Sequence, residues 1–195
     1  YTNTGSRPSR LFCDRHLQIM ENLYRHIQAI NEWIGRLISW LTLFMVLVTF
    51  LVVMLRYAFD LGWIAMQESV VYMHGFVFML GAAYTLKHQG HVRVDIFYQR
   101  FSARSRAWVD LLGTLFLLFP VSIFIIWMGW EYVSDSWSVF EGSREAGGLP
   151  GVFLLKSLII AMPVLMLLQG SALVLRQVLI LQGKLAVEQQ GAGLD

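Results

Sequence analysis

The histidines of this sequence are candidates for chemistry, because a histidine can bind haem or a metal ion. His74 is the only histidine within a long apolar segment, and His88 and His91 follow that segment three residues apart. A membrane haem of the b type commonly takes two histidines from facing helices, whereas the sequence places one inside a segment. We therefore expect no haem or metal, and we expect His74 to form a hydrogen bond to a neighbouring helix. Gln169, within the last apolar segment, indicates the same kind of contact.

The charged residues that border the apolar segments are the other candidates for chemistry. Glu68, Glu131 and Lys156 lie at segment ends, and no segment carries an acid in its middle. An ion or proton path across a membrane needs intramembrane charge, whereas charges at helix ends reach the interface and form ion pairs there. The sequence contains no phosphate-binding glycine loop, nucleophile elbow or His/Glu metal motif. With a single cysteine, Cys13, no internal disulfide can form, and we predict a protein that is not an enzyme and holds no cofactor.

Four uncharged apolar segments position these residues, over residues 37–55, 69–86, 111–130 and 157–175. At about 1.5 Å per helical residue, each segment reaches about 27–30 Å, which is the thickness of a bilayer core. Charged residues make up 14% of the chain, against about 25% in a typical globular domain. The sequence therefore predicts an all-α integral membrane protein, with a four-helix transmembrane domain over residues 37–176.

The residues before the first span form a fifth predicted element. Between residues 15 and 36, apolar side chains recur every three or four positions, which is typical of an amphipathic helix. We expect this helix to lie on the membrane interface or to pack against a partner. Residues 1–14 are polar and contain Gly5 and Pro8, so they are expected to be flexible. Residues 177–195 form a C-terminal tail, in which residues 183–195 are expected to be disordered.

The distribution of basic residues predicts the orientation of the spans. Twelve of the 15 lysines and arginines lie in the two terminal segments and in the middle loop, residues 87–106. Arg56, Arg144 and Lys156 lie on the opposite side. Because cytoplasmic loops carry the excess of Lys and Arg, both termini and the middle loop are predicted to be cytoplasmic. The net charge of +2 is too small to indicate a nucleic-acid partner.

The middle loop contains the segment His91-Val-Arg-Val-Asp-Ile96, in which polar and apolar residues alternate. Alternation formally indicates a β-strand, but a single strand beside a membrane has no strand to pair with. We expect a structured loop followed by a short interfacial helix around residues 96–101, with Ser102 as the N-cap of the next helix. Asp95 is the only acid among five basic residues in this loop, so we expect it to pair with one of them.

The loop before the fourth span contains the segment Glu141-Gly-Ser-Arg-Glu-Ala-Gly-Gly-Leu-Pro150. Gly147 and Gly148 permit positive φ and a tight turn, and Pro150 favours the start of a helix. Two alternatives follow from this pattern. The segment is either a well-formed connecting turn or a shaped extracytoplasmic surface that meets a partner.

Together these motifs resemble the small membrane subunit, of the DctQ type, of tripartite ATP-independent periplasmic (TRAP) transporters. The resemblance rests on Gly90-His-Val-Arg-Val-Asp95 followed by Arg104, Arg106 and Trp108, and on Trp137, Glu141-x-Ser143 and Gly147-Gly-Leu-Pro150 before Lys156. It also rests on four spans with both termini inside, and it covers roughly residues 34–176. Ala146 departs from the pattern, because such proteins often have proline before the paired glycines.

The resemblance implies a place in a bacterial inner-membrane complex that takes up organic acids, such as carboxylates, with an ion gradient. In such systems a periplasmic binding protein captures the substrate, and a separate large membrane subunit carries the substrate and ion sites. The small subunit braces the large one in the bilayer. The residues implied in partner contacts or structure are Gly90, His91, Arg93, Asp95, Arg104, Arg106, Trp137, Glu141, Ser143, Gly147, Gly148, Pro150 and Lys156.

Two other functions remain open at this point. A four-helix membrane haem protein would show a Soret band that is lost when His74 is replaced. A self-assembling channel would need a polar path inside the bundle, for which only His74, Gln169 and a few hydroxyls are available. The sequence favours the transporter subunit over both.

Overall fold

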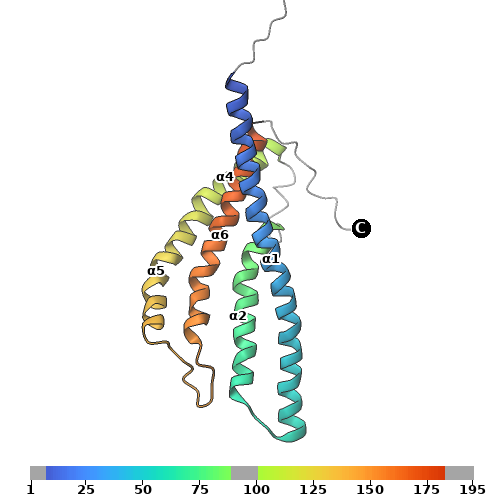
Figure 1. The fold of residues 1–195 in the computed structure, drawn as a ribbon, viewed down its shortest axis with the longest axis vertical. Helices are drawn as coiled ribbons and strands as arrows, with labels where there is room; N and C mark the ends of the chain where they lie inside the picture. The colour runs from blue at the N-terminus through green and yellow to red at the C-terminus, as the bar shows by residue number, and fades with distance from the viewer. Residues whose placement is uncertain (1–7, 89–100, 183–195) are drawn as a thin grey trace, which may run out of the picture.

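The computed structural model of the chain describes residues 8–88 and 101–182, and all the secondary structure in them is helical. Four helical stretches of the described residues are long and apolar enough to cross a membrane, which confirms the predicted all-α fold with four spans. The elements, labelled in Figure 1, are α1 (Pro8–Phe59), α2 (Ile64–Lys87), α4 (Ala103–Gly113), the π-helix η1 (Thr114–Leu118), α5 (Phe119–Ser138) and α6 (Val152–Leu181).

The helices extend beyond the predicted apolar segments at both ends. The candidate spans contain 36, 24, 35 and 30 residues. At about 1.5 Å per residue they reach about 36–54 Å, which exceeds the thickness of a bilayer core. Backbone hydrogen bonding carries a helix through flanking polar residues as readily as through apolar ones, so hydropathy marks the apolar middle of each helix and not its ends.

The N-terminal part of the chain is one continuous helix of 52 residues, which differs from the two elements expected from the sequence. No break separates residues 15–36 from the first span, and residues 8–14, expected to be flexible, are its first turns. Pro8 occupies the first helical position, where a missing N–H costs nothing. Only part of the amphipathic face packs inside the molecule, because Ile27 is buried whereas Ile30 is 49% exposed.

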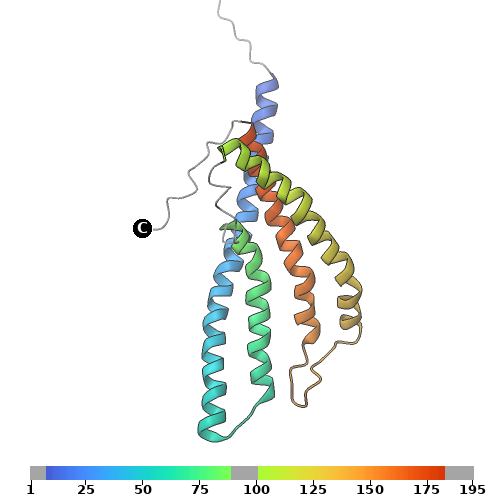
Figure 2. The same ribbon diagram turned by 180° about the vertical axis from the view of Figure 1, so that it is seen from behind.

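The bundle is built around α6. Seen from opposite sides in Figures 1 and 2, α6 lies between α5 on one side and the α1–α2 pair on the other, and α4 packs against its C-terminal part. The start of α1 and the end of α6 lie toward the same end of the molecule, and the α1–α2 and α5–α6 connections lie at the opposite end.

Small residues allow the helices to approach one another closely. Ala83 on α2 and Ala172 on α6 are buried at 1% and 0% exposure. A Cβ atom on Gly170 would lie 2.8 Å from Leu118 and Phe119, so this glycine lets α6 contact the η1–α5 junction. Close packing of small residues is the usual basis of helix association in membranes, where water does not drive association.

A π-helical turn joins α4 to α5 directly before Pro120. The N–H of Phe119 donates to the carbonyl of Thr114, five residues earlier, and the Thr114 hydroxyl donates to the carbonyl of Asp110 at 2.7 Å. In an α-helix a proline ring clashes with the carbonyl four residues before it. The wider turn accommodates the ring of Pro120 and lets the helix continue through it.

Candidate functional site

The α5–α6 loop, residues 139–151, is tied to α2 through one carboxylate. The Ser143 hydroxyl donates to Glu68 Oε1, and the backbone N–H of Leu149 donates to Glu68 Oε2 at 2.6 Å. Hydrogen bonds to an ionised carboxylate are stronger than those between neutral groups. Glu68 therefore connects the first pair of helices to the loop of the second pair.

A second carboxylate ties the same loop to α5 and α6. Glu141 Oε2 accepts from Lys156 Nζ on α6 at 2.5 Å and from the Ser136 hydroxyl on α5 at 2.8 Å. The Lys156 ammonium also lies 3.9 Å from the ring centroid of Tyr132, in a cation–π arrangement. The Lys156 and Glu141 side chains are only 16% and 27% exposed, so water screens this ion pair weakly.

The turn predicted from the paired glycines is present between these two contacts. Gly147 has φ of +80°, a conformation that side chains disfavour, and the Gly148 N–H donates to the Glu145 carbonyl at 3.0 Å. A Cβ atom on Gly148 would lie 2.7 Å from Glu68 Oε2 and closer still to Ser143. Gly148 thus gives the loop room to reach the Glu68 carboxylate.

The sequence predicted that Pro150 begins the last helix, but the structure shows a later start. The helix α6 starts at Val152, after Gly151, whose φ of −145° is not helical. Pro150 packs instead against the backbone of Gly142, where an added Cβ would lie 3.5 Å from the Pro150 Cα atom. The flexible residue after the proline displaces the helix start by two positions and leaves Pro150 within the loop.

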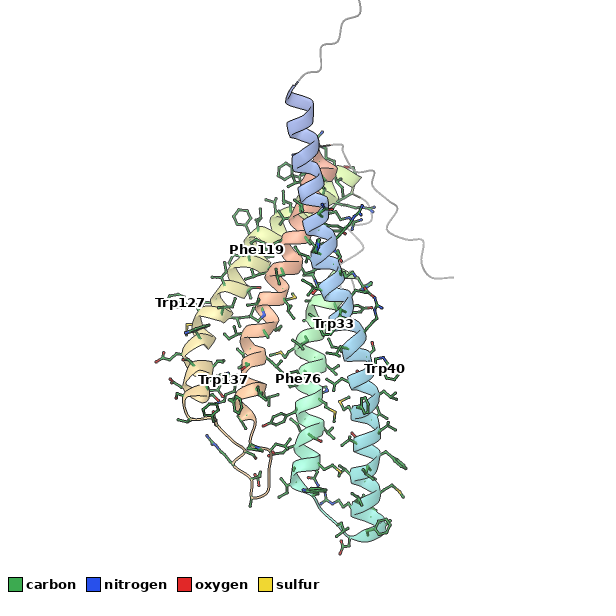
Figure 3. The ribbon with its side chains drawn as sticks, viewed as in Figure 1. Trp33, Trp40, Phe76, Phe119, Trp127 and Trp137 are labelled. Atoms are coloured by element: carbon green, nitrogen blue, oxygen red, sulfur yellow. The ribbon has the colours of Figure 1, made fainter. Side chains whose placement is uncertain are left out.

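An aromatic cluster covers one side of the loop. Trp137, which is labelled in Figure 3, donates from Nε1 to the Ser157 hydroxyl at 2.8 Å. The centroid of its ring lies 4.7 Å from that of the Phe153 ring. Phe140, with φ of +46°, packs edge-on against Phe153 at 5.7 Å between ring centroids. The sequence predicted a role for Trp137 but not for its two phenylalanine partners, because nothing in the pattern brings residues 140 and 153 together.

At the other end of the bundle, α1 and α2 are joined just before the middle loop. Lys87 Nζ lies 2.6 Å from Glu32 Oε2 and donates to the Gln28 carbonyl at 3.2 Å. His88 Nε2 lies 3.6 Å from the same Glu32 oxygen. This contact could not be predicted from the sequence, because a lysine at a helix end normally reaches water or lipid headgroups.

The structure describes the middle loop only at its two ends, residues 87–88 and 101–106. Gly90, His91, Arg93 and Asp95 lie outside the described residues, as does most of the short helix expected around residues 96–101. Ser102 is the predicted N-cap of α4 and accepts from the Ser105 N–H at 3.3 Å. Of the two predicted arginines, Arg104 is exposed, and Arg106 donates from Nε to the Phe101 carbonyl at 3.1 Å.

The prediction for His74 is wrong, whereas that for Gln169 is confirmed. His74 lies on an exposed side of α2, stacked on Phe78, and makes no hydrogen bond to any residue that the structure describes. The adjacent Gly75 is the residue that faces α6, so the histidine points away from it. Gln169 is completely buried and accepts from Asn31 Nδ2 at 2.6 Å. Within the described residues, no three His, Cys, Asp or Glu side chains gather to hold a metal ion.

Because of the ion pair between Glu141 and Lys156, we expect the folded protein to lose stability at acid pH. The hydrogen bond from Lys156, and then that from Ser136, lower the pKa of Glu141 below its usual 4.5. A lowered pKa in the folded state stabilises the fold above the unfolded pKa, and this contribution is lost as pH falls through the folded pKa. The melting temperature of the purified protein should therefore decrease as the pH is lowered below about 4.5. The Glu141→Gln variant should lose less over that range, and equal losses in both proteins would contradict the assignment.

Comparison with known proteins gives one match. The family model for tripartite ATP-independent periplasmic transporters, DctQ component, matches residues 45–179. No curated protein and no solved structure gives a match. The matched residues contain the second part of the first span, from residue 45, the second and third spans, nearly all of the fourth, and both carboxylates that hold the α5–α6 loop. The chain therefore belongs to the DctQ family, the small membrane components of TRAP transporters.

Proposed function

We propose that this chain is a non-catalytic scaffold that braces the large membrane subunit of a TRAP-type secondary transporter. The large subunit is a separate chain that carries the substrate and ion sites. A periplasmic binding protein delivers an organic acid, such as a carboxylate, and an ion gradient drives its uptake. The complex lies in the bacterial inner membrane, with both termini of this chain in the cytoplasm.

The observation that carries this proposal is that charged side chains at both ends of the described bundle bind other groups of this chain. Glu68, Glu141 and Lys156 bind groups of this chain at one end of the bundle, and Glu32 and Lys87 bind each other at the opposite end. A carrier for an anion and a coupling ion needs such groups to contact its cargo inside the membrane. These side chains instead join helices and a loop into one body, which is the property of a scaffold.

The apolar surfaces of α1 and α5 support the same proposal. Trp40 on α1 and Trp127 on α5 project from the outer sides of the bundle at 65% and 76% exposure (Figure 3). Exposed apolar surface of this extent requires lipid or another apolar protein surface to cover it. Other exposed apolar side chains on α1 and on the η1–α5 stretch are Phe44, Leu47, Phe50, Val53, Phe116, Leu117, Ile123 and Phe124.

Reconstitution into liposomes tests the scaffold role. The proposal expects no substrate uptake by this chain alone, and uptake only when it is combined with the large subunit and the binding protein. The large subunit without this chain should show a lower rate or a lower yield of folded protein. Uptake by this chain alone, or undiminished uptake by the large subunit alone, would contradict the proposal.

The proposed orientation predicts the behaviour of reporter fusions. Alkaline phosphatase, which is active only outside the cytoplasm, should be inactive when fused after Asp195 and active when fused after Gly62, in the α1–α2 connection. A green fluorescent protein fused at the same two points should show the reverse pattern. This expectation rests on the excess of lysine and arginine at the chain ends and in the middle loop. The opposite pattern would invert the assignment of every loop.

A further inference from the structure

A buried pair of amides joins two helices that are far apart in the sequence. Asn31 on α1 donates from Nδ2 to Oε1 of Gln169 on α6 at 2.6 Å. The two residues are 2% and 0% exposed. Asn31 precedes the residues that match the DctQ family, and Gln169 is one of them. The pair therefore attaches the N-terminal part of α1 to the helix around which the bundle is built.

On both helices, polar atoms next to this contact have no hydrogen-bond partner among the described residues. The buried Nε2 of Gln169 has no acceptor among the described residues. Asn31 Oδ1 receives no hydrogen bond from them, and Gln28 Oε1, one turn away on the same helix, is a buried oxygen without a donor. Residues three apart on a helix lie on one face. One unused donor group on α6 thus accompanies two unused acceptors on α1.

Buried polar groups in folded proteins almost always have a protein or water partner, because an unpaired one keeps its full desolvation cost. A buried water forms about two to four hydrogen bonds and needs a polar site. It accepts from one donor and donates to two acceptors, which matches the groups left over here. We propose that an ordered water molecule binds between α1 and α6, accepting from Gln169 Nε2 and donating to the Asn31 and Gln28 side-chain oxygens.

The assignment of nitrogen and oxygen in the two amides does not affect this inference. Exchanging the atoms in both side chains would reverse the direction of the 2.6 Å hydrogen bond and leave one donor and one acceptor unused, as before. A partner subunit cannot supply the acceptor that Gln169 Nε2 lacks, because Gln169 has no surface that another chain could touch. A water molecule is small enough to occupy such a position, and it completes the joint between the two helices.

A density map of the full chain, within the complex that it forms and at a resolution that shows ordered waters, tests this site. The proposal expects a peak within hydrogen-bonding distance of the Gln169 amide and of Asn31 or Gln28. It also expects the peak to be lost in Gln169→Met, which has a similar shape but no amide. The matched control is Gln177→Met, since Gln177 donates to Asp110 instead and its loss should leave the peak in place.

Two results would overturn the proposal. The first is a wild-type map that shows other interior waters but none here, with the Gln169 amide bonded directly to a second protein group. The second is a peak that persists in Gln169→Met, because the water would then be held by other groups. The wild-type map alone decides the question if the variant fails to fold.

Discussion

The Gly148→Val variant is expected to lose most of the assembled complex and most of the transport activity. The valine Cβ would lie 2.7 Å from Glu68 Oε2 and would overlap with Ser143, so the loop must move away from α2. Overpacking of this kind typically costs about 1–3 kcal/mol. The displacement would also separate the Leu149 N–H from the carboxylate that accepts its hydrogen bond. Complex yield after gentle detergent extraction and uptake in cells both measure the effect.

Gly62→Val provides the matched control for this variant. Gly62 lies in the α1–α2 connection at the same end of the bundle, and an added Cβ there meets nothing within 4 Å. The same change of residue should therefore leave yield and uptake close to wild type. Equal behaviour of the two variants would show that the space at Gly148 is not needed, and the role assigned to the loop would fail.

The Glu68→Leu variant is expected to have the second large effect, a lower melting temperature together with poor assembly. Leucine removes both acceptors at once, so the Ser143 O–H and the Leu149 N–H each lose the acceptor of their hydrogen bond. An unpaired polar group in a shielded position costs more than the lost hydrogen bond itself. Ser143→Ala should have a smaller effect, because it removes one donor and leaves the bond from Leu149 intact.

Glu131→Leu is the control for the loss of a carboxylate. Glu131 is exposed on α5, and its backbone carbonyl, not its side chain, accepts from the Ser134 hydroxyl. This substitution removes the same charge near the same end of the bundle. The two leucine variants could instead have the same melting temperature and assemble equally well. In that case the contacts of Glu68 with the loop contribute nothing beyond the loss of one negative charge.

The helical framework could be predicted from the sequence because hydropathy reports burial in lipid directly. Each of the apolar segments lies inside one long helix, or inside the α4–η1–α5 helical stretch. The glycine turn at Gly147 was also predictable, since its need for positive φ is a local property of the backbone. The sequence pattern does not decide whether residues 15–36 and the first span form one helix or two, because an amphipathic pattern and an apolar pattern are both compatible with a single helix.

The contacts that hold the site together could not be predicted, because they join residues far apart in the chain. Glu68 meets Leu149 across 81 positions, and Asn31 meets Gln169 across 138. Which face of a helix turns inward depends on its neighbours, so Gly75 faces α6 and His74 does not. The sequence alone shows that a glutamate lies at a helix end. It does not show that two hydrogen-bond donors from a distant loop bind its carboxylate.

The most direct test of the scaffold function is to extract this chain from native membranes in a gentle detergent and identify the proteins that remain bound to it by mass spectrometry. The scaffold account predicts a large multi-span membrane protein in stoichiometric amount, with the periplasmic binding protein present when substrate is added. A chain that is recovered alone, stable and self-associated, would contradict the account.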